Sequence, residues 1–252
     1  MVPIALSTSI FGGERIRHLT RENVAYVELS SHKPDELQPI IKKIRDEGIQ
    51  VLGIHGPAPN ITGEHPNLGN PACFNDDFKA IAASFDTARQ TGCRFVTIHP
   101  FYVLGTERLP KEDEIKFEFL RRLQSRFPSL EAYLKSDEYR TAKDNAINAL
   151  GEIMRRTEGE FGDIAICLEN LNPRITYGLQ RLSEFREIRE RVESNRLFLD
   201  LDLPHAWLAA TAYGLDFDAE VKSVTDLTAV LSLCQNHGGI YCVDRKYNES
   251  SP

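Results

Sequence analysis

Five strand-like runs in this chain each lead into a side chain that can bind a metal ion or move a proton. In a parallel α/β barrel the carboxyl ends of all strands face one mouth, where active sites are built. The pattern therefore predicts a barrel in which residues far apart in sequence meet at one pocket. The side chains are His55 after residues 51–54, His99 after 95–98, Glu169 after 164–168, Asp200, Asp202 and His205 after 197–199, and Asp244 after 240–243.

Strand and helix patterns alternate along the whole chain, which is typical of repeated βα units around a parallel sheet. The strand runs are almost continuously apolar, as expected for strands covered on both faces. A length of 252 residues suits one α/β barrel, so we predict a single domain over 1–252. The predicted strands are 2–8, 24–30, 50–55, 94–99, 163–169, 196–202 and 239–243, and the predicted helices are 35–47, 76–91, 136–157 and 183–192.

Two features depart from a regular eight-stranded barrel. Residues 101–136 are too long for a simple connection and predict a helical insertion, with an extra helix over 111–126. The inserted helix is either a lid over the mouth of the barrel or a solvent-exposed surface segment. Only seven strands are visible, so the C-terminal closing strand is missing from the pattern. The barrel is then open, or closed by another chain, or the sequence is part of something longer.

The composition excludes some partners. A formal net charge of -7 opposes binding to a phosphate backbone, so a nucleic-acid partner is not expected. Five cysteines without a CxxC pair fit free thiols in a reducing compartment. Neither a signal peptide nor a membrane-spanning run is visible, so we predict a cytoplasmic protein with no membrane partner.

Two imidazoles and one carboxylate, from His55, His99 and Glu169, form a ligand set suited to zinc or another first-row divalent ion. Asp202 would add a second carboxylate, and Asp202 to His205 form a D-x-x-H arrangement directly after a strand. The alternative is a set of hydrogen-bonding pocket residues that hold no ion. We expect Asp200 to pair with a lysine or arginine. His65 is expected on the surface.

In this order and at these strand ends, the motifs resemble the xylose-isomerase-like barrel superfamily, which includes sugar isomerases and epimerases and the endonuclease IV group. The resemblance spans nearly the whole chain. It rests on V-E-L at 27–29, His55, I-H-P at 98–100, L-E-N at 168–170 and D-x-x-H at 202–205.

The epimerase branch of this superfamily implies a divalent ion held by Glu, Asp, His and a second Glu, with proton exchange between the two glutamates. Glu169 and Asp202 match the first two ligands, and His205 matches a substrate-binding histidine. The resemblance fails at the predicted seventh strand, where Tyr241 stands in place of the histidine, and the eighth-strand glutamate has no counterpart. Asp244 is the candidate replacement.

The endonuclease IV branch implies three zinc ions. His55, His99 and Glu169 match all ligands of one ion, whereas Asp202 and His205 match only parts of the other two sets. The trinuclear site is therefore incomplete, which argues against cleavage of DNA at abasic sites.

These observations lead to a metal-dependent isomerase or epimerase of a small sugar or sugar derivative, acting by proton transfer next to a carbonyl. The alternatives are a non-catalytic barrel with a remnant pocket, or a zinc-dependent hydrolase. The cofactor would be Zn, Mn or Mg, and a homo-oligomer is possible. The predicted roles are catalysis by Glu169 and Asp244, substrate binding by His55, His205, Glu28 and Asn170, and metal binding by Glu169, Asp202, His99 and His55.

Overall fold

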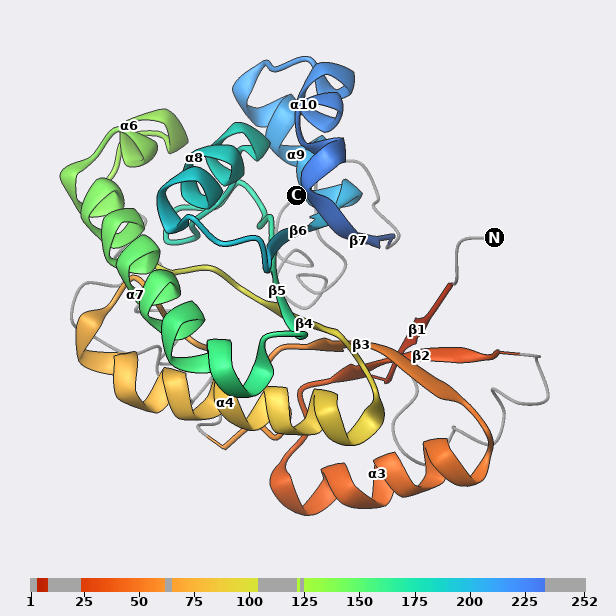
Figure 1. Cartoon of the computed structure of the whole chain (residues 1–252). Helices are drawn as coiled ribbons and strands as arrows, with labels where there is room; N and C mark the ends of the chain where they lie inside the picture. Colours follow the sequence, from red (N-terminus) through yellow and green to blue (C-terminus); the bar gives the residue numbers. More distant parts are fainter. Residues whose placement is uncertain (1–3, 9–23, 62–64, 104–121, 123–124, 234–252) are drawn as a thin grey trace.

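A computed structural model of the chain shows one parallel sheet of seven strands, in which each strand pairs with its neighbours in sequence order (Figure 1). The structure describes residues 4–8, 24–61, 65–103, 122 and 125–233. The strands are β1 (Leu6–Ser7), β2 (Tyr26–Ser30), β3 (Gln50–His55), β4 (Phe95–Ile98), β5 (Ala165–Glu169), β6 (Leu197–Asp202) and β7 (Thr228–Ser232).

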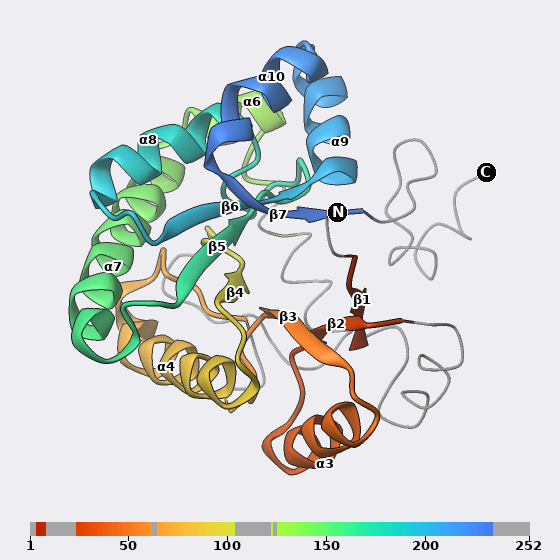
Figure 2. The ribbon, with the colours of Figure 1, turned by 45° about the vertical axis from the view of Figure 1, so that its right-hand side comes forward.

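The sheet curls, and the main helices follow one another around its outer face (Figure 2). No strand joins β7 to β1 within the described residues, so this part of the barrel is open on one side. The predicted α/β barrel is confirmed, and no closing strand is present among the described residues. The helices are α3 (Pro34–Asp46), α4 (Phe74–Thr91), α6 (Leu130–Leu134), α7 (Asp137–Phe161), α8 (Leu182–Val192), α9 (Leu203–Tyr213) and α10 (Phe217–Val224), with short 3₁₀ turns η2 (Pro71–Cys73) and η3 (Thr225–Leu227).

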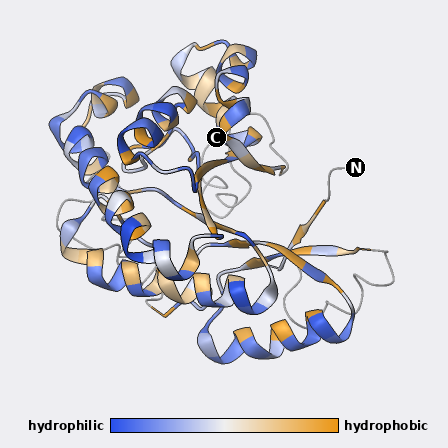
Figure 3. Ribbon diagram, viewed as in Figure 1, coloured by the Kyte–Doolittle hydropathy of each residue, from blue (hydrophilic) through white to orange (hydrophobic). Residues whose placement is uncertain are grey.

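Apolar residues fill the space between the sheet and its helices. All five residues of β5 are buried, as predicted for a strand covered on both faces. α3 turns Leu37, Ile40, Ile41 and Ile44 inward, at the spacing of one helix face. Figure 3 shows the same division, with hydrophobic colour along the strands and hydrophilic colour on much of the outer helix surface.

The seventh strand of the sheet is not the predicted one. Thr228–Ser232 takes this position beside β6, with Asp202 paired to Ser232. The predicted strand 239–243 lies outside the described residues. The segment T-A-V-L-S was overlooked because it is short and only partly buried, and so lacks the long apolar run of the other strands.

Much of the predicted insertion over 101–136 also lies outside the described residues, including nearly all of the helix expected over 111–126. Near the end of this segment, Leu130–Leu134 forms the short helix α6. Among the described residues, no helix has the length and apolar character needed to span a membrane.

Candidate metal centre

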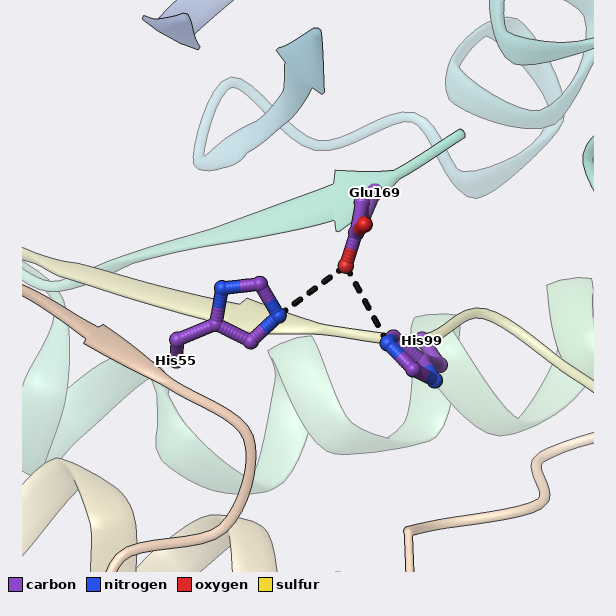
Figure 4. Close-up of side chains that lie close together, drawn as sticks. All are labelled: His55, His99 and Glu169. Carbon is purple, nitrogen blue, oxygen red and sulfur yellow. Dashed lines mark ion pairs between the residues drawn. The ribbon is translucent and has the colours of Figure 1, made fainter. Parts of the chain in front are cut away.

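Three neighbouring strands bring two imidazoles to one carboxylate oxygen. His55 ends β3, His99 follows β4 and Glu169 ends β5, so the parallel register places all three at the same edge of the sheet. Nε2 of His55 lies 2.9 Å from Glu169 Oε2, and Nε2 of His99 lies 3.1 Å from the same oxygen (Figure 4). The predicted meeting of these three side chains is therefore present.

The arrangement fits a divalent metal ion. Glu169 Oε2 is buried and, among the described residues, accepts no well-aligned hydrogen bond, although two imidazole nitrogens lie close to it. One ligand atom from each of the three residues lies within 4.8 Å of the others. Two nitrogens and one oxygen form a donor set that first-row divalent ions accept, with further positions open for water or substrate.

The electrostatics of this cluster keep Glu169 ionised. Burial disfavours a charged carboxylate, but the adjacent His55 and His99 hold the pKa of Glu169 well below its usual value. Burial also opposes a charged imidazole, yet Glu169 holds the pKa of His55 well above its usual value. A carboxylate that stays charged at neutral pH between two imidazoles is suited to binding a cation.

Each imidazole has a second partner. Nδ1 of His55 lies 3.5 Å from Glu28 Oε2, which comes from β2. Nδ1 of His99 hydrogen-bonds the hydroxyl of Tyr102, and the ring of His65 stacks on His99 with centroids 4.2 Å apart. His65 is exposed, as expected, but its place against His99 was missed, and Tyr102 was not predicted at all.

A second cluster shares Glu169 and comes from the junction of β6 and α9. The ligand atoms of Glu169, Asp202 and His205 lie within 4.8 Å of one another, and His205 Nδ1 is 3.3 Å from Glu169 Oε1. Asp202 also caps α9, because its Oδ1 accepts a 2.7 Å hydrogen bond from the backbone N–H of His205. The D-x-x-H arrangement is thus a helix cap and a candidate ligand pair together.

Asn170 holds the end of β6 in place. Its Nδ2 donates to the carbonyl of Asp202 at 3.0 Å, and its Oδ1 accepts from the N–H of Asp202 at 2.9 Å. The backbone carbonyl of Asn170 accepts from Nδ1 of His205 at 2.8 Å, which fixes a proton on that nitrogen. The side chain is fully buried, so its position is explained by these contacts without a substrate.

The expected pairing of Asp200 with a lysine or arginine is wrong. Asp200 is fully buried, and its carboxyl oxygens accept hydrogen bonds from Thr97 Oγ1 at 2.9 Å and Ser232 Oγ at 2.8 Å. Burial, together with the negative charge of Glu169, raises the pKa of Asp200 to about 7. Hydroxyls replace the expected cation because the side chain points into the interior of the curl.

The structure gathers all the predicted site residues except one around Glu169. His55, His99, Asp202, His205, Glu28 and Asn170 all lie within this group of contacts, whereas Asp244 lies outside the described residues. β7 contributes the hydroxyl of Ser232, and its five residues include no histidine or carboxylate. Thr97 could have been found from sequence, since it has the same strand parity as His99.

The fold and these side chains define a parallel α/β barrel with a candidate metal centre at the carboxyl ends of its strands. The chain belongs to the xylose isomerase-like TIM barrel family, whose model matches residues 20–245. The predicted resemblance is confirmed. A comparison with curated proteins finds no match.

Solved structures with the same fold include a D-tagatose 3-epimerase-like protein, with 15% identity, a TM-score of 0.67 and coverage of 95% of this chain and 78% of the other. An AP endonuclease of family 2 from Brucella melitensis has 13% identity, a TM-score of 0.65 and coverage of 96% and 84%. The 3-keto-D-glucoside 4-epimerase YcjR from E. coli has 14% identity, a TM-score of 0.61 and coverage of 94% and 80%. At these identities the similarity establishes the fold alone.

Proposed function

We propose that this chain is a metal-dependent isomerase or epimerase of a small sugar or sugar derivative, acting by proton transfer at a carbon next to a carbonyl. One observation carries the proposal. The ionised carboxylate of Glu169 directs Oε2 to His55 and His99 and Oε1 to His205. Such a carboxylate can hold an ion on one side and exchange a proton on the other.

In this proposal, Glu169, Asp202, His99 and His55 hold the ion. A divalent ion, when bound there, polarises a substrate carbonyl and its neighbouring hydroxyl. Glu169 Oε1 removes the proton from the hydroxyl-bearing carbon next to the carbonyl, and His205 stabilises the carboxylate from 3.3 Å. His55, His205 and Glu28 bind substrate hydroxyls. Asp244 is proposed to exchange the proton on the opposite face of the substrate.

The chemical class of the substrate is supported by the similar structures. Several are described as epimerases of sugars, including the 3-keto-D-glucoside 4-epimerase and an L-ribulose 3-epimerase. The acidic charge of the chain also favours a neutral carbohydrate over a polyanionic ligand. Fold similarity by itself does not define a reaction, so the proposal rests on Glu169 and its partners.

A second candidate is a zinc-dependent hydrolase. It is favoured by the convergence of His55, His99 and Glu169 on one point, together with the lack of an imidazole in β7. Three protein ligands and one open position are the usual arrangement of a catalytic zinc. Tetrahedral zinc at these three residues would support hydrolysis, whereas a six-coordinate ion at Glu169 and Asp202 would support isomerisation.

The test is the metal content of purified wild-type protein and Glu169→Gln, measured side by side by elemental analysis. Glu190→Gln is the control, because Glu190 is an exposed carboxylate of α8. We expect about one ion per chain in the wild type and the control, and a loss in Glu169→Gln.

The metal-loaded wild type is then incubated with ketoses and aldoses in D₂O. Incorporation of deuterium next to the carbonyl would support the isomerase. No metal in any protein after incubation with zinc, manganese and magnesium would rule out both metalloenzyme proposals and leave a non-catalytic pocket.

A further inference from the structure

We propose that Tyr102 is a positioning residue for the metal centre, and that its hydroxyl fixes His99 with Nδ1 protonated and Nε2 directed to the ion. This inference rests on the metal site of the proposed function. It assigns a role to a residue outside every motif on which that function depends. The contact that carries it is the hydrogen bond between the Tyr102 hydroxyl and Nδ1 of His99.

Tyr102 is held by backbone contacts on both sides. Its N–H donates to Asn67 Oδ1 at 2.9 Å, and the next residue, Val103, donates its N–H to the carbonyl of Thr176 at 2.8 Å. A bridge also joins Tyr102 to Tyr177. The phenol is therefore presented to His99 by a segment that is fixed at two separate points.

The segment is also fixed by close packing. The N–H of Gly178 donates to the carbonyl of Phe101 at 3.0 Å. A Cβ atom at position 178 would lie 2.3 Å from the Phe101 ring, so the two segments approach as closely as a glycine allows. Because Phe101 precedes Tyr102, this contact limits movement of the phenol relative to the segment around Gly178.

The chemistry of the pair favours one tautomer of the imidazole. A neutral histidine that binds a metal through Nε2 carries its proton on Nδ1 and donates it to an outer partner. The hydroxyl of Tyr102 can accept that hydrogen bond. A phenol is an uncharged hydrogen-bond partner at neutral pH. A neutral partner orients the ring without adding a charge beside the ion.

The other imidazole is held less tightly. Nδ1 of His55 faces Glu28 at 3.5 Å, at the long limit of a hydrogen bond, and 17% of the Glu28 side chain is exposed. Tyr102 is only 6% exposed. Of the two side chains that contact an imidazole Nδ1, Tyr102 is thus less free to move than Glu28.

The experiment compares zinc affinity, by competition with a chromophoric chelator, in wild type, Tyr102→Phe and Tyr133→Phe. Tyr133 is a matched control, because it is also a buried tyrosine but donates its hydroxyl to the carbonyl of Tyr177 at 2.9 Å. We expect Tyr102→Phe to weaken zinc binding by about 10- to 100-fold, the usual cost of losing an outer partner. Tyr133→Phe should bind zinc as the wild type does.

Equal affinity in wild type and Tyr102→Phe would overturn this inference and leave the metal site intact. No zinc binding in the wild type would overturn the proposed function and this inference with it. Should Tyr102→Phe fail to fold, nitrogen NMR of the zinc-loaded wild type decides. A slowly exchanging proton on Nδ1 of His99 supports the role, and zinc on Nδ1, or a rapidly exchanging proton there, contradicts it.

Discussion

The ends of β3, β4 and β5 differ from the ends of β6 and β7 in what their polar side chains do. On the first side, His55 and His99 direct nitrogens to a Glu169 oxygen that accepts no well-aligned hydrogen bond among the described residues. On the second side, the carboxylates contribute to the fold. Asp202 caps α9, and Asp200 accepts hydrogen bonds from two hydroxyls.

This difference shows that a polar residue at a strand end does not by itself indicate a functional group. The residue types on the two sides are similar, but their hydrogen bonds are not. Side chains whose atoms face one another without good hydrogen-bond geometry are candidates for binding something else. Side chains with well-formed hydrogen bonds to the backbone or to hydroxyls stabilise the fold.

The largest expected effect concerns the two imidazoles of the first side. His55→Ala and His99→Ala should each weaken zinc binding by more than about 100-fold, beyond the usual cost of losing an outer partner. His205→Ala should cost less than about tenfold, or 1.4 kcal/mol, because its Nδ1 is already engaged by the carbonyl of Asn170. The measurement is chelator competition.

His32→Ala is the control for these variants, since His32 hydrogen-bonds Thr8 rather than Glu169. An equal loss of affinity in all three site variants would contradict the division into two sides. It would instead indicate one continuous ligand set around Glu169.

A smaller effect is expected from Asp200. Its pKa of about 7 in the folded protein exceeds the unfolded value of about 3.9, so between these pH values the folded state holds a proton that the unfolded state releases. The contribution to stability is complete below pH about 4 and is lost as pH rises to about 7, at about 1.4 kcal/mol per pH unit. Raising the pH from 5 to 6.5 should therefore lower the free energy of unfolding by about 2 kcal/mol through Asp200.

The measurement is urea unfolding of metal-free wild type and Asp200→Asn at both pH values. Glu169, His55 and Glu28 also affect the charge around Asp200, so the difference between the two proteins isolates its contribution. The stability of Asp200→Asn should fall less with pH than that of the wild type. Parallel pH profiles would show that Asp200 is ionised throughout this range.

The smallest effect separates the two roles of Asp202. Asp202→Ala should lower the free energy of unfolding by about 1 kcal/mol through loss of the helix cap, whereas Asp202→Asn keeps the cap and should change it by a few tenths. Both should weaken metal binding. Asp216→Ala is the control, because Asp216 caps α10 away from the site. Unchanged metal affinity in Asp202→Asn would leave Asp202 with the structural role alone.

Much of the fold follows from the sequence because buried parallel strands are apolar along their whole length. The runs before His55, His99 and Glu169 therefore identified β3, β4 and β5 closely. β7 was not found because Thr228–Ser232, an edge strand within the described part of the sheet, has partly exposed residues and a mixed composition. Edge strands carry a weaker pattern than central ones.

The sequence predicted those residues of the site that lie at the ends of strands. Parallel register brings His55, His99 and Glu169 together wherever the strands are correctly placed. The hydrogen bonds were not predictable in the same way. Thr97 and Asp200 are separated by 103 positions, and the approach of Tyr102 to His99 depends on contacts with Asn67 and Thr176. Such pairs are determined by tertiary packing.

The bond between Thr97 and Asp200 has a mechanical consequence. It joins β4 to β6, which are not neighbours in the sheet, and so passes across the curl over β5. Flattening the sheet would lengthen this 2.9 Å contact, and tighter curling would compress it. The bond therefore links two non-adjacent strands and resists changes in the curvature of a sheet that, within the described residues, no strand closes.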